Sequence, residues 1–228
     1  ELMPEQKKLY EAYLSVAKKE VRRMLDERNS GVMILSILTR LRQICCHPAL
    51  FDDNYTDRSG KLEVLCELLL SAISGGHRIL VFSQFTSMLK IIRKELDARG
   101  IMSFYLDGAT PPSERAELSD RFNGGERSVF LISLKAGGTG LNLVGADMVI
   151  HYDPWWNPAV TDQASDRAYR IGQKRAVLVI RLVTSGTIEE QILKLQDKKR
   201  ALADGVIIKN SATLSNLTND EILSLFES

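Results

Sequence analysis

Short apolar runs alternate with amphipathic stretches through the middle of the chain, and this alternation limits the choice of fold more than any other feature. The first run, Ile79–Phe82, is continuous and apolar, which is typical of a strand buried on both faces. Further strands are predicted at 103–106, 129–132, 148–151 and 177–183, with helices at 86–99 and 112–122. Strands that alternate with helices predict βαβ units and a parallel sheet with right-handed crossovers. The predicted fold class is therefore α/β, with a three-layer α/β/α core.

Helical stretches flank this core in the sequence. Apolar residues at helical spacing predict helices over 4–27, 32–46 and 61–74 before it, and over 188–203 and 220–226 after it. The polar, turn-rich stretch 51–60 is interpreted as a linker. A chain of 228 residues has room for one sizeable domain with appendages or for two small domains. We therefore expect a helical N-terminal segment (1–55), an α/β lobe (56–185) and a helical tail (186–228).

The composition excludes several classes of protein. Hydrophobic residues make up 44% of the chain, which is enough for a core, and 30 basic against 29 acidic residues leave a net charge of +1. Any nucleic-acid ligand would therefore need a local basic patch. Three cysteines without a CxxC pair argue against a disulfide framework or a zinc site, so no metal site is predicted. Without a signal peptide or a membrane-spanning apolar run, we expect an intracellular protein with no membrane partner. Because Glu1 is not an initiator residue, we expect a fragment of a longer chain.

The loops that follow the predicted strands are the candidate ligand sites, because ligands of open parallel sheets bind beyond the carboxyl ends of the strands. Ser83 and Gln84 follow the first strand, and Gly108 follows the second. The third strand leads into 133–142, where three glycines in four residues follow Lys135 and are able to form a phosphate-binding nest. No stretch matches a Walker A loop, a Walker B strand or the GxGxxG pattern. The glycine-rich turn therefore has two interpretations, a phosphate site or a tight connection.

The loop after the fourth strand holds Trp155 and Trp156 between two prolines, and it is either a hydrophobic plug or a functional loop. The stretch 162–175 then begins as a helix and ends at a glycine turn. Within it, Arg167 and Arg170 are three residues apart, a spacing that puts both on one helix face. A guanidinium is a planar fork that matches phosphate oxygens, so this pair fits an arginine finger in phosphoryl transfer. The alternative is a solvated helix face.

Four stretches of the sequence together resemble motifs IV to VI of the Swi/Snf-type ATPases, which belong to helicase superfamily two and translocate on double-stranded DNA. These stretches are ILVFSQF, YLDGATP, LISLKAGGTGLNLVGADMVIHYDPWWNP and DQASDRAYRIGQKR. The upstream LRQICCHPALF and the downstream VTSGTIEEQILKLQDKKR resemble flanking elements of the same family. The resemblance covers about the whole chain, and the tail SNLTNDEILSLF is closer in appearance to prokaryotic members.

The resemblance implies a RecA-like second lobe, the C-terminal half of a two-lobed, DNA-dependent ATPase. Such an enzyme holds ATP between its lobes, with Mg held mainly by an N-terminal lobe that carries Walker A and the Asp-Glu box. This chain has neither motif, so it is expected to be inactive alone and to need the N-terminal RecA-like lobe of the same full-length protein. The other implied partners are double-stranded DNA and a DNA-bound protein substrate. The tail would contain the brace helix of the family, and the implied location is the nucleoid in a prokaryote or the nucleus in a eukaryote.

The resemblance also implies roles for individual residues. Arg167 and Arg170 would be the arginine fingers, and Gln163 would couple the cleft to their movement. The nucleotide would be approached by Gly138, Gly140 and Asn142, with Asn142 near the ribose. The DNA track would be lined by Ser83, Gln84, Gly108, Lys135, Thr139, Trp155 and Trp156, although the tryptophans fit a buttress of the cleft equally well.

Three other functions are compatible with parts of the pattern. A strand-separating superfamily two helicase shares the sheet and an arginine helix, but its relatives carry a QRxGRxGR form where this chain has DRAYRIGQ. A non-catalytic DNA-binding or interaction lobe is disfavoured because both arginines are present. A Rossmann-type dinucleotide binder is disfavoured because GxGxxG is missing after the first strand.

Overall fold

The computed structural model describes residues 1–25, 31–137, 140–169, 176–203 and 218–227. The chain divides into two compact units, which are described one at a time. Unit 1 consists of residues 1–62, 156–158 and 183–228, and unit 2 consists of residues 63–155 and 159–182. Within the described part of the chain, no helix has both the length and the apolar character needed to cross a membrane.

Unit 2 is built on a five-stranded sheet in which every neighbouring pair of strands is parallel. The strands are β1 (Ile79–Ser83), β2 (Ser103–Leu106), β3 (Val129–Ser133), β4 (Met148–His151) and β5 (Leu178–Arg181), in the spatial order β2-β3-β1-β4-β5. The register pairs Ser83 with Ser133 and Phe82 with His151. The carboxyl ends of β1, β3 and β4 therefore lie at one edge of the sheet. The predicted parallel sheet is confirmed, and β5 is shorter than the predicted strand 177–183.

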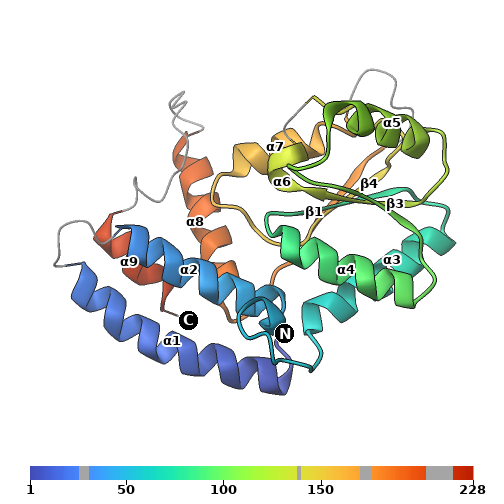
Figure 1. The fold of residues 1–228 in the computed structure, drawn as a ribbon. Helices are drawn as coiled ribbons and strands as arrows, with labels where there is room; N and C mark the ends of the chain where they lie inside the picture. The colour runs from blue at the N-terminus through green and yellow to red at the C-terminus, as the bar shows by residue number, and fades with distance from the viewer. Residues whose placement is uncertain (26–30, 138–139, 170–175, 204–217, 228) are drawn as a thin grey trace. The chain divides into compact units, whose positions relative to one another are not determined.

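Helices cover both faces of this sheet, which confirms the predicted three-layer α/β fold. Figure 1 shows α3 (Gly60–Ser74) and α4 (Thr86–Ala98) on one face, and α5 (Pro112–Asn123), α6 (Leu134–Gly137) and α7 (Pro158–Ser165) on the other. The layers form because every residue of β1 and β3 is buried, so both faces of the central strands must be covered by apolar helix surfaces. The one-turn helix α6 was not predicted, because its four residues are too few to show a helical period.

Unit 1 is helical. It contains α1 (Pro4–Met24), α2 (Gly31–Cys46), a 3₁₀ turn at Pro48–Leu50, α8 (Ile188–Ala203) and α9 (Asn219–Leu225). One apolar cluster draws residues from all four α-helices, for example Tyr10, Leu38, Ile192 and Leu225. The predicted N-terminal segment and the predicted tail therefore share one core. The predicted end of the first helix at residue 27 lies outside the described residues.

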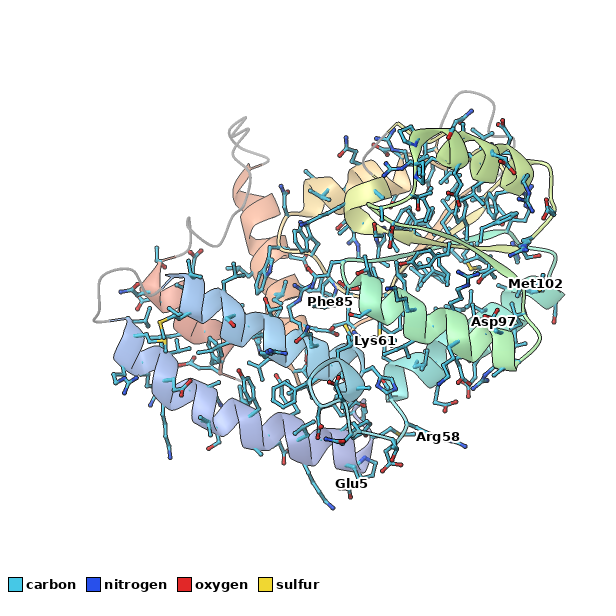
Figure 2. The ribbon with its side chains drawn as sticks, viewed as in Figure 1. Glu5, Arg58, Lys61, Phe85, Asp97 and Met102 are labelled. Atoms are coloured by element: carbon cyan, nitrogen blue, oxygen red, sulfur yellow. The ribbon has the colours of Figure 1, made fainter. Side chains whose placement is uncertain are left out.

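A buried ion pair lies inside unit 1, between the first turns of α3 and α8. Lys61 Nζ is 2.5 Å from Oε1 of Glu189 and also donates to Oε2. The side chains are 4% and 0% exposed, and Figure 2 labels Lys61 near the start of α3. Glu189 also accepts from the backbone N–H of Thr184 at 2.9 Å. Burial, the largest single influence, acts to lower the pKa of Lys61, but the charge of Glu189, its hydrogen bond and the neighbouring Cys46 and Cys45 together leave a raised pKa.

Candidate functional site

The loop after β1 is tied to the loop after β4 by a buried carboxylate. Asp153 is 4% exposed and accepts hydrogen bonds from the Ser83 hydroxyl and from the backbone N–H of Gln84. Ser83 Oγ in turn accepts from the backbone N–H of Phe85, which precedes α4 (Figure 2). The Ser83 hydroxyl therefore makes its hydrogen bonds to groups within unit 2. Sequence reasoning missed Asp153, although its place directly after a buried strand is the position where functional side chains are expected.

Gln84 is the second residue predicted on the DNA track, and it is half-buried. Its side-chain nitrogen Nε2 is buried and has no hydrogen-bond partner among the described residues. A buried amide donor without a partner is destabilising, so this atom would gain from an acceptor, and a contact of Gln84 with DNA stays a prediction.

The loop after β2 places Gly108 in an exposed turn. The guanidinium of Arg115, on α5, donates to the carbonyls of Thr110 at 2.7 Å and of Gly108 at 3.1 Å. Because Gly108 has no side chain and nothing lies within 4 Å of the position its Cβ would occupy, another backbone is able to approach closely here. The carbonyl of Gly108 is therefore engaged by Arg115, and a phosphate contact at this turn stays a prediction.

The glycine-rich loop after β3 begins with α6, whose Lys135 is exposed. Gly140 has a φ of +73°, in the left-handed region that favours glycine, and its surroundings are open on the Cβ side. Asn142 is exposed, while its backbone carbonyl accepts from Asn123 Nδ2 at 2.9 Å. Gly138 and Thr139 lie outside the described residues. The described part of the loop thus combines an exposed cation, a left-handed glycine turn and an exposed amide side chain.

Replacing Gly137 with alanine is expected to destabilise unit 2 by about 1–3 kcal/mol, because the new Cβ would overpack the core. That atom would lie 2.7 Å from Cε1 of Phe82, a buried ring that is itself stacked on His151 at 5.5 Å. Urea unfolding of this chain measures the effect, and Gly108→Ala is the matched control because its Cβ would meet open space. A second substitution, Phe82→Leu, should recover part of the loss. Equal stability of Gly137→Ala and Gly108→Ala would contradict the packing argument.

The two tryptophans after β4 belong to different units. Trp155 is half-buried and packs on the apolar cluster of unit 2, whereas Trp156 packs on the cluster of unit 1. The guanidinium of Arg42, a residue that is 1% exposed, lies 5.3 Å from the centre of the Trp156 ring. Both side chains therefore contribute to cores, which favours the buttress interpretation of this loop. Because both tryptophan side chains are partly exposed, their contact with DNA stays a prediction.

The predicted helix through Arg167 ends earlier than expected. α7 ends at Ser165, where the pattern of backbone hydrogen bonds changes. The N–H of Asp166 donates to the Asp162 carbonyl at 2.9 Å, as in an α-helix. The N–H of Arg167 instead donates to the Ala164 carbonyl at 3.3 Å, which closes a tighter turn. The prediction that a helix carries Arg167 is therefore wrong. Arg167 is also only 6% exposed, which excludes a solvated helix face for this residue.

Arg167 is joined to the glycine-rich loop through the backbone. The N–H of Leu143 donates to the carbonyl of Arg167 at 3.1 Å, and Leu143 directly follows the exposed Asn142. The structure thus brings together the predicted nucleotide-binding loop and the first predicted finger. Gln163 is exposed on α7. Arg170, the second predicted finger, lies outside the described residues.

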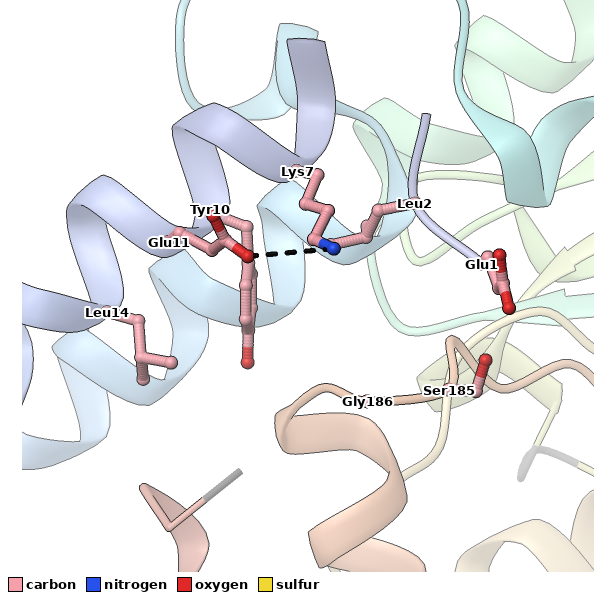
Figure 3. Close-up of a pocket in the computed structure, with 8 residues that line it drawn as sticks. All are labelled: Glu1, Leu2, Lys7, Tyr10, Glu11, Leu14, Ser185 and Gly186. Atoms are coloured by element: carbon pink, nitrogen blue, oxygen red, sulfur yellow. Dashed lines mark ion pairs between the residues drawn. The ribbon is translucent and has the colours of Figure 1, made fainter. Parts of the chain in front are cut away.

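One cavity in unit 1 contains none of the predicted site residues. It has a volume of about 460 Å³ and is lined by Glu1, Leu2, Lys7, Tyr10, Glu11, Leu14, Ser185 and Gly186 (Figure 3). Lys7 and Glu11 form an exposed ion pair at 3.8 Å on its wall. Across the described ranges, no cluster of three or more His, Cys, Asp or Glu side chains has the arrangement of a metal site.

Comparison with known proteins finds a matching family. Residues 60–172 match the family described as the helicase conserved C-terminal domain. A putative ATP-dependent helicase/translocase of Bacillus subtilis, YwqA, is 44% identical over 200 residues, a match that covers 85% of this chain. The chain spans only 22% of the length of that relative.

Two solved structures resemble the whole chain. The Sulfolobus solfataricus SWI2/SNF2 ATPase C-terminal domain is 32% identical with a TM-score of 0.77, and the match covers 98% of this chain and 93% of that one. The Sulfolobus solfataricus SWI2/SNF2 ATPase core in complex with dsDNA is 34% identical with a TM-score of 0.79, and the match covers 99% of this chain and 48% of that one. The similarity therefore extends from sequence to the RecA-like fold.

Proposed function

Because the chain belongs to the Swi/Snf-type family of helicase-like ATPases, as a C-terminal RecA-like lobe, we propose that it is the second motor lobe of an ATP-dependent translocase on double-stranded DNA. ATP binding closes this lobe and an N-terminal lobe on each other, and hydrolysis lets the two lobes separate. The lobes thereby advance along the duplex alternately. The N-terminal RecA-like lobe of the full-length protein is then an obligatory partner, and a DNA-bound protein is the cargo. The nucleoid or the nucleus is the corresponding location.

The nucleotide half of this proposal depends on the hydrogen bond between Leu143 and Arg167. Because that bond couples the turn at Arg167 to the segment after Asn142, a ligand that contacts Gly140 or Asn142 would act on the backbone that is bonded to the arginine, and Gly138 is proposed to contact the same ligand. Arg167 and Arg170 are the fingers for the γ-phosphate, and Gln163 lies on the helix that leads to them. Gly140 and Asn142 fit one side of ATP, since both are exposed and the glycine leaves open space. The phosphates and Mg would be held mainly by the N-terminal lobe.

The DNA half depends on the loops at the carboxyl edge of the sheet. Gln84 brings an unpaired amide donor, Gly108 an open backbone and Lys135 an exposed charge, and each of these suits a phosphate oxygen. Ser83 would act through the bond that orders the Gln84 loop, and Thr139 would add a hydroxyl. Trp155 and Trp156 would buttress the track. Binding through phosphates should tolerate any sequence and weaken as salt rises.

The proposal is tested by the ATPase rate of this chain alone, mixed with its N-terminal lobe, and fused to that lobe, each with and without duplex DNA. We expect negligible turnover by the chain alone, because half of the site is missing, and DNA-stimulated turnover in the fused form. A strand-displacement assay on the same fused protein should show no separated strands. Robust turnover by the chain alone would contradict the split site, and strand displacement would favour the neighbouring helicase family instead.

A further inference from the structure

The end of β4 carries a buried histidine that the proposed function does not use. His151 is 3% exposed and is the last residue of β4, next to Phe82 of β1 on one side and Arg181 of β5 on the other. Its ring stacks on the ring of Phe82, with 5.5 Å between centroids and 19° between the planes. The ring therefore has a fixed orientation within the sheet.

This ring holds the end of α7. Nε2 of His151 lies 2.9 Å from Oγ of Ser165, the last residue of the helix. The Ser165 hydroxyl has a single proton, and it donates that proton to the carbonyl of Thr161 at 3.1 Å. The oxygen must therefore accept from His151, which places a proton on Nε2.

Burial keeps this histidine neutral. Burial lowers the pKa of His151 to about 4, and the positive charge of Arg181 acts in the same direction. Arg181 in turn forms an ion pair with Asp162 of α7 at 3.4 Å. That second link between α7 and the sheet is partly exposed, with side chains 35% and 51% accessible, so water and salt weaken it. The bond from His151 to Ser165, in contrast, is buried.

A displacement of Ser165 is expected to move Arg167, because backbone hydrogen bonds close the turn between them. The N–H of Ala168 donates to the carbonyl of Ser165 at 3.0 Å, and the flanking Ala164 and Ala168 are buried. α7 itself has only 8 residues, so it is too short to keep its position without tertiary contacts. The position of the arginine therefore depends on what anchors Ser165.

We propose that His151 and Ser165 are positioning residues, which act through Arg167 by fixing the end of α7 against the sheet. This inference rests on the proposed function, since it gives Arg167 its catalytic task. Loss of the bond should lower the rate of the chemical step more than nucleotide affinity, because a displacement of about 1 Å costs on the order of 10²-fold in rate.

The test uses the full-length protein and measures DNA-stimulated ATP hydrolysis at saturating DNA. Ser165→Ala and His151→Leu should each lower kcat by about 10- to 100-fold, with little change in KM for ATP. His151→Gln, which restores an N–H donor at similar reach, should recover most of kcat. In an Arg167→Ala background, Ser165→Ala should cause no further loss, because both substitutions remove the same contribution.

The matched control is Val149→Ala, a buried residue of the same strand without a polar side chain, which should lower the melting temperature and keep kcat. Loss of activity in Arg167→Ala but wild-type kcat in Ser165→Ala would overturn the inference alone. Equal losses of kcat in His151→Gln and His151→Leu would overturn it as well, because the ring would then matter for packing and not for its donor. Wild-type kcat in Arg167→Ala would overturn the finger assignment and this inference together.

Discussion

Replacing Glu189 with glutamine is expected to destabilise unit 1 by about 3–5 kcal/mol, because it leaves the ammonium group of Lys61 buried without its counter-charge. Both side chains are almost fully buried, and the carboxylate also accepts the backbone N–H of Thr184, so three hydrogen bonds lose their charged acceptor at once. Urea unfolding with hydrogen exchange read by mass spectrometry measures the loss and assigns it to α1, α2 and α8.

Two controls separate this charge effect from ordinary packing. The double variant Lys61→Met, Glu189→Met should be more stable than Glu189→Gln, because it removes both charges together. Glu11→Gln breaks an exposed pair with Lys7 in the same unit, whose side chains are 62% and 63% accessible, and should cost no more than about 1 kcal/mol. If Glu189→Gln were as stable as Glu11→Gln, the buried pair would have no structural importance.

The pH dependence of this contribution follows from the raised pKa of Lys61. The folded protein holds the proton more tightly than the unfolded chain, whose lysine has a pKa of 10.5. The stabilisation is therefore complete below pH 10.5 and is lost as the pH rises through the raised pKa. The Glu189→Gln variant should lack this alkaline decline.

The strands were predictable because each is a short apolar run, and a run such as Ile79–Phe82 identifies a doubly buried strand without knowledge of its neighbours. The edge at which ligands bind followed from the parallel order of those strands. The pair of Lys61 and Glu189 was not predictable, since 128 residues separate its members and nothing local to either one marks it. The same limit applies to Asp153 and Ser83, and to His151 and Ser165.

The helix boundary at Ser165 shows where periodicity fails as a signal. Residues 162–168 keep helical spacing in the sequence, but the Ser165 hydroxyl bonds the Thr161 carbonyl and the next backbone bonds tighten. The tryptophans show a related limit. Nothing in the sequence distinguishes the two adjacent tryptophans. Trp155 nevertheless packs in unit 2 and Trp156 in unit 1, because the boundary between the units falls between them.

In the full-length protein, Arg167→Ala is expected to lower the DNA-stimulated kcat for ATP by about 10³-fold or more, which is the contribution typical of an arginine finger. The buried setting of Arg167 strengthens this expectation, because a guanidinium held by surrounding structure needs little reorganisation when charge develops on the transferred phosphoryl group. Arg167→Lys should lose most of the activity as well, since an ammonium group keeps the charge but not the planar fork.

The alternative role for a buried arginine is purely structural, and stability separates the two. A finger predicts that Arg167→Ala binds duplex DNA normally and retains cooperative unfolding while kcat collapses. A structural role predicts a large fall in melting temperature, with kcat per folded molecule preserved. Arg121→Ala is the matched control: this arginine of α5 is 40% exposed, forms surface ion pairs with Glu117 and Glu126 and lies 5.2 Å from the centre of the Phe104 ring, so its loss should keep kcat and lower the melting temperature only slightly. Near-normal hydrolysis by Arg167→Ala would contradict the finger assignment. The hydrogen bond between Leu143 and Arg167 would then be a structural contact, and Arg170 would be the remaining candidate for the finger.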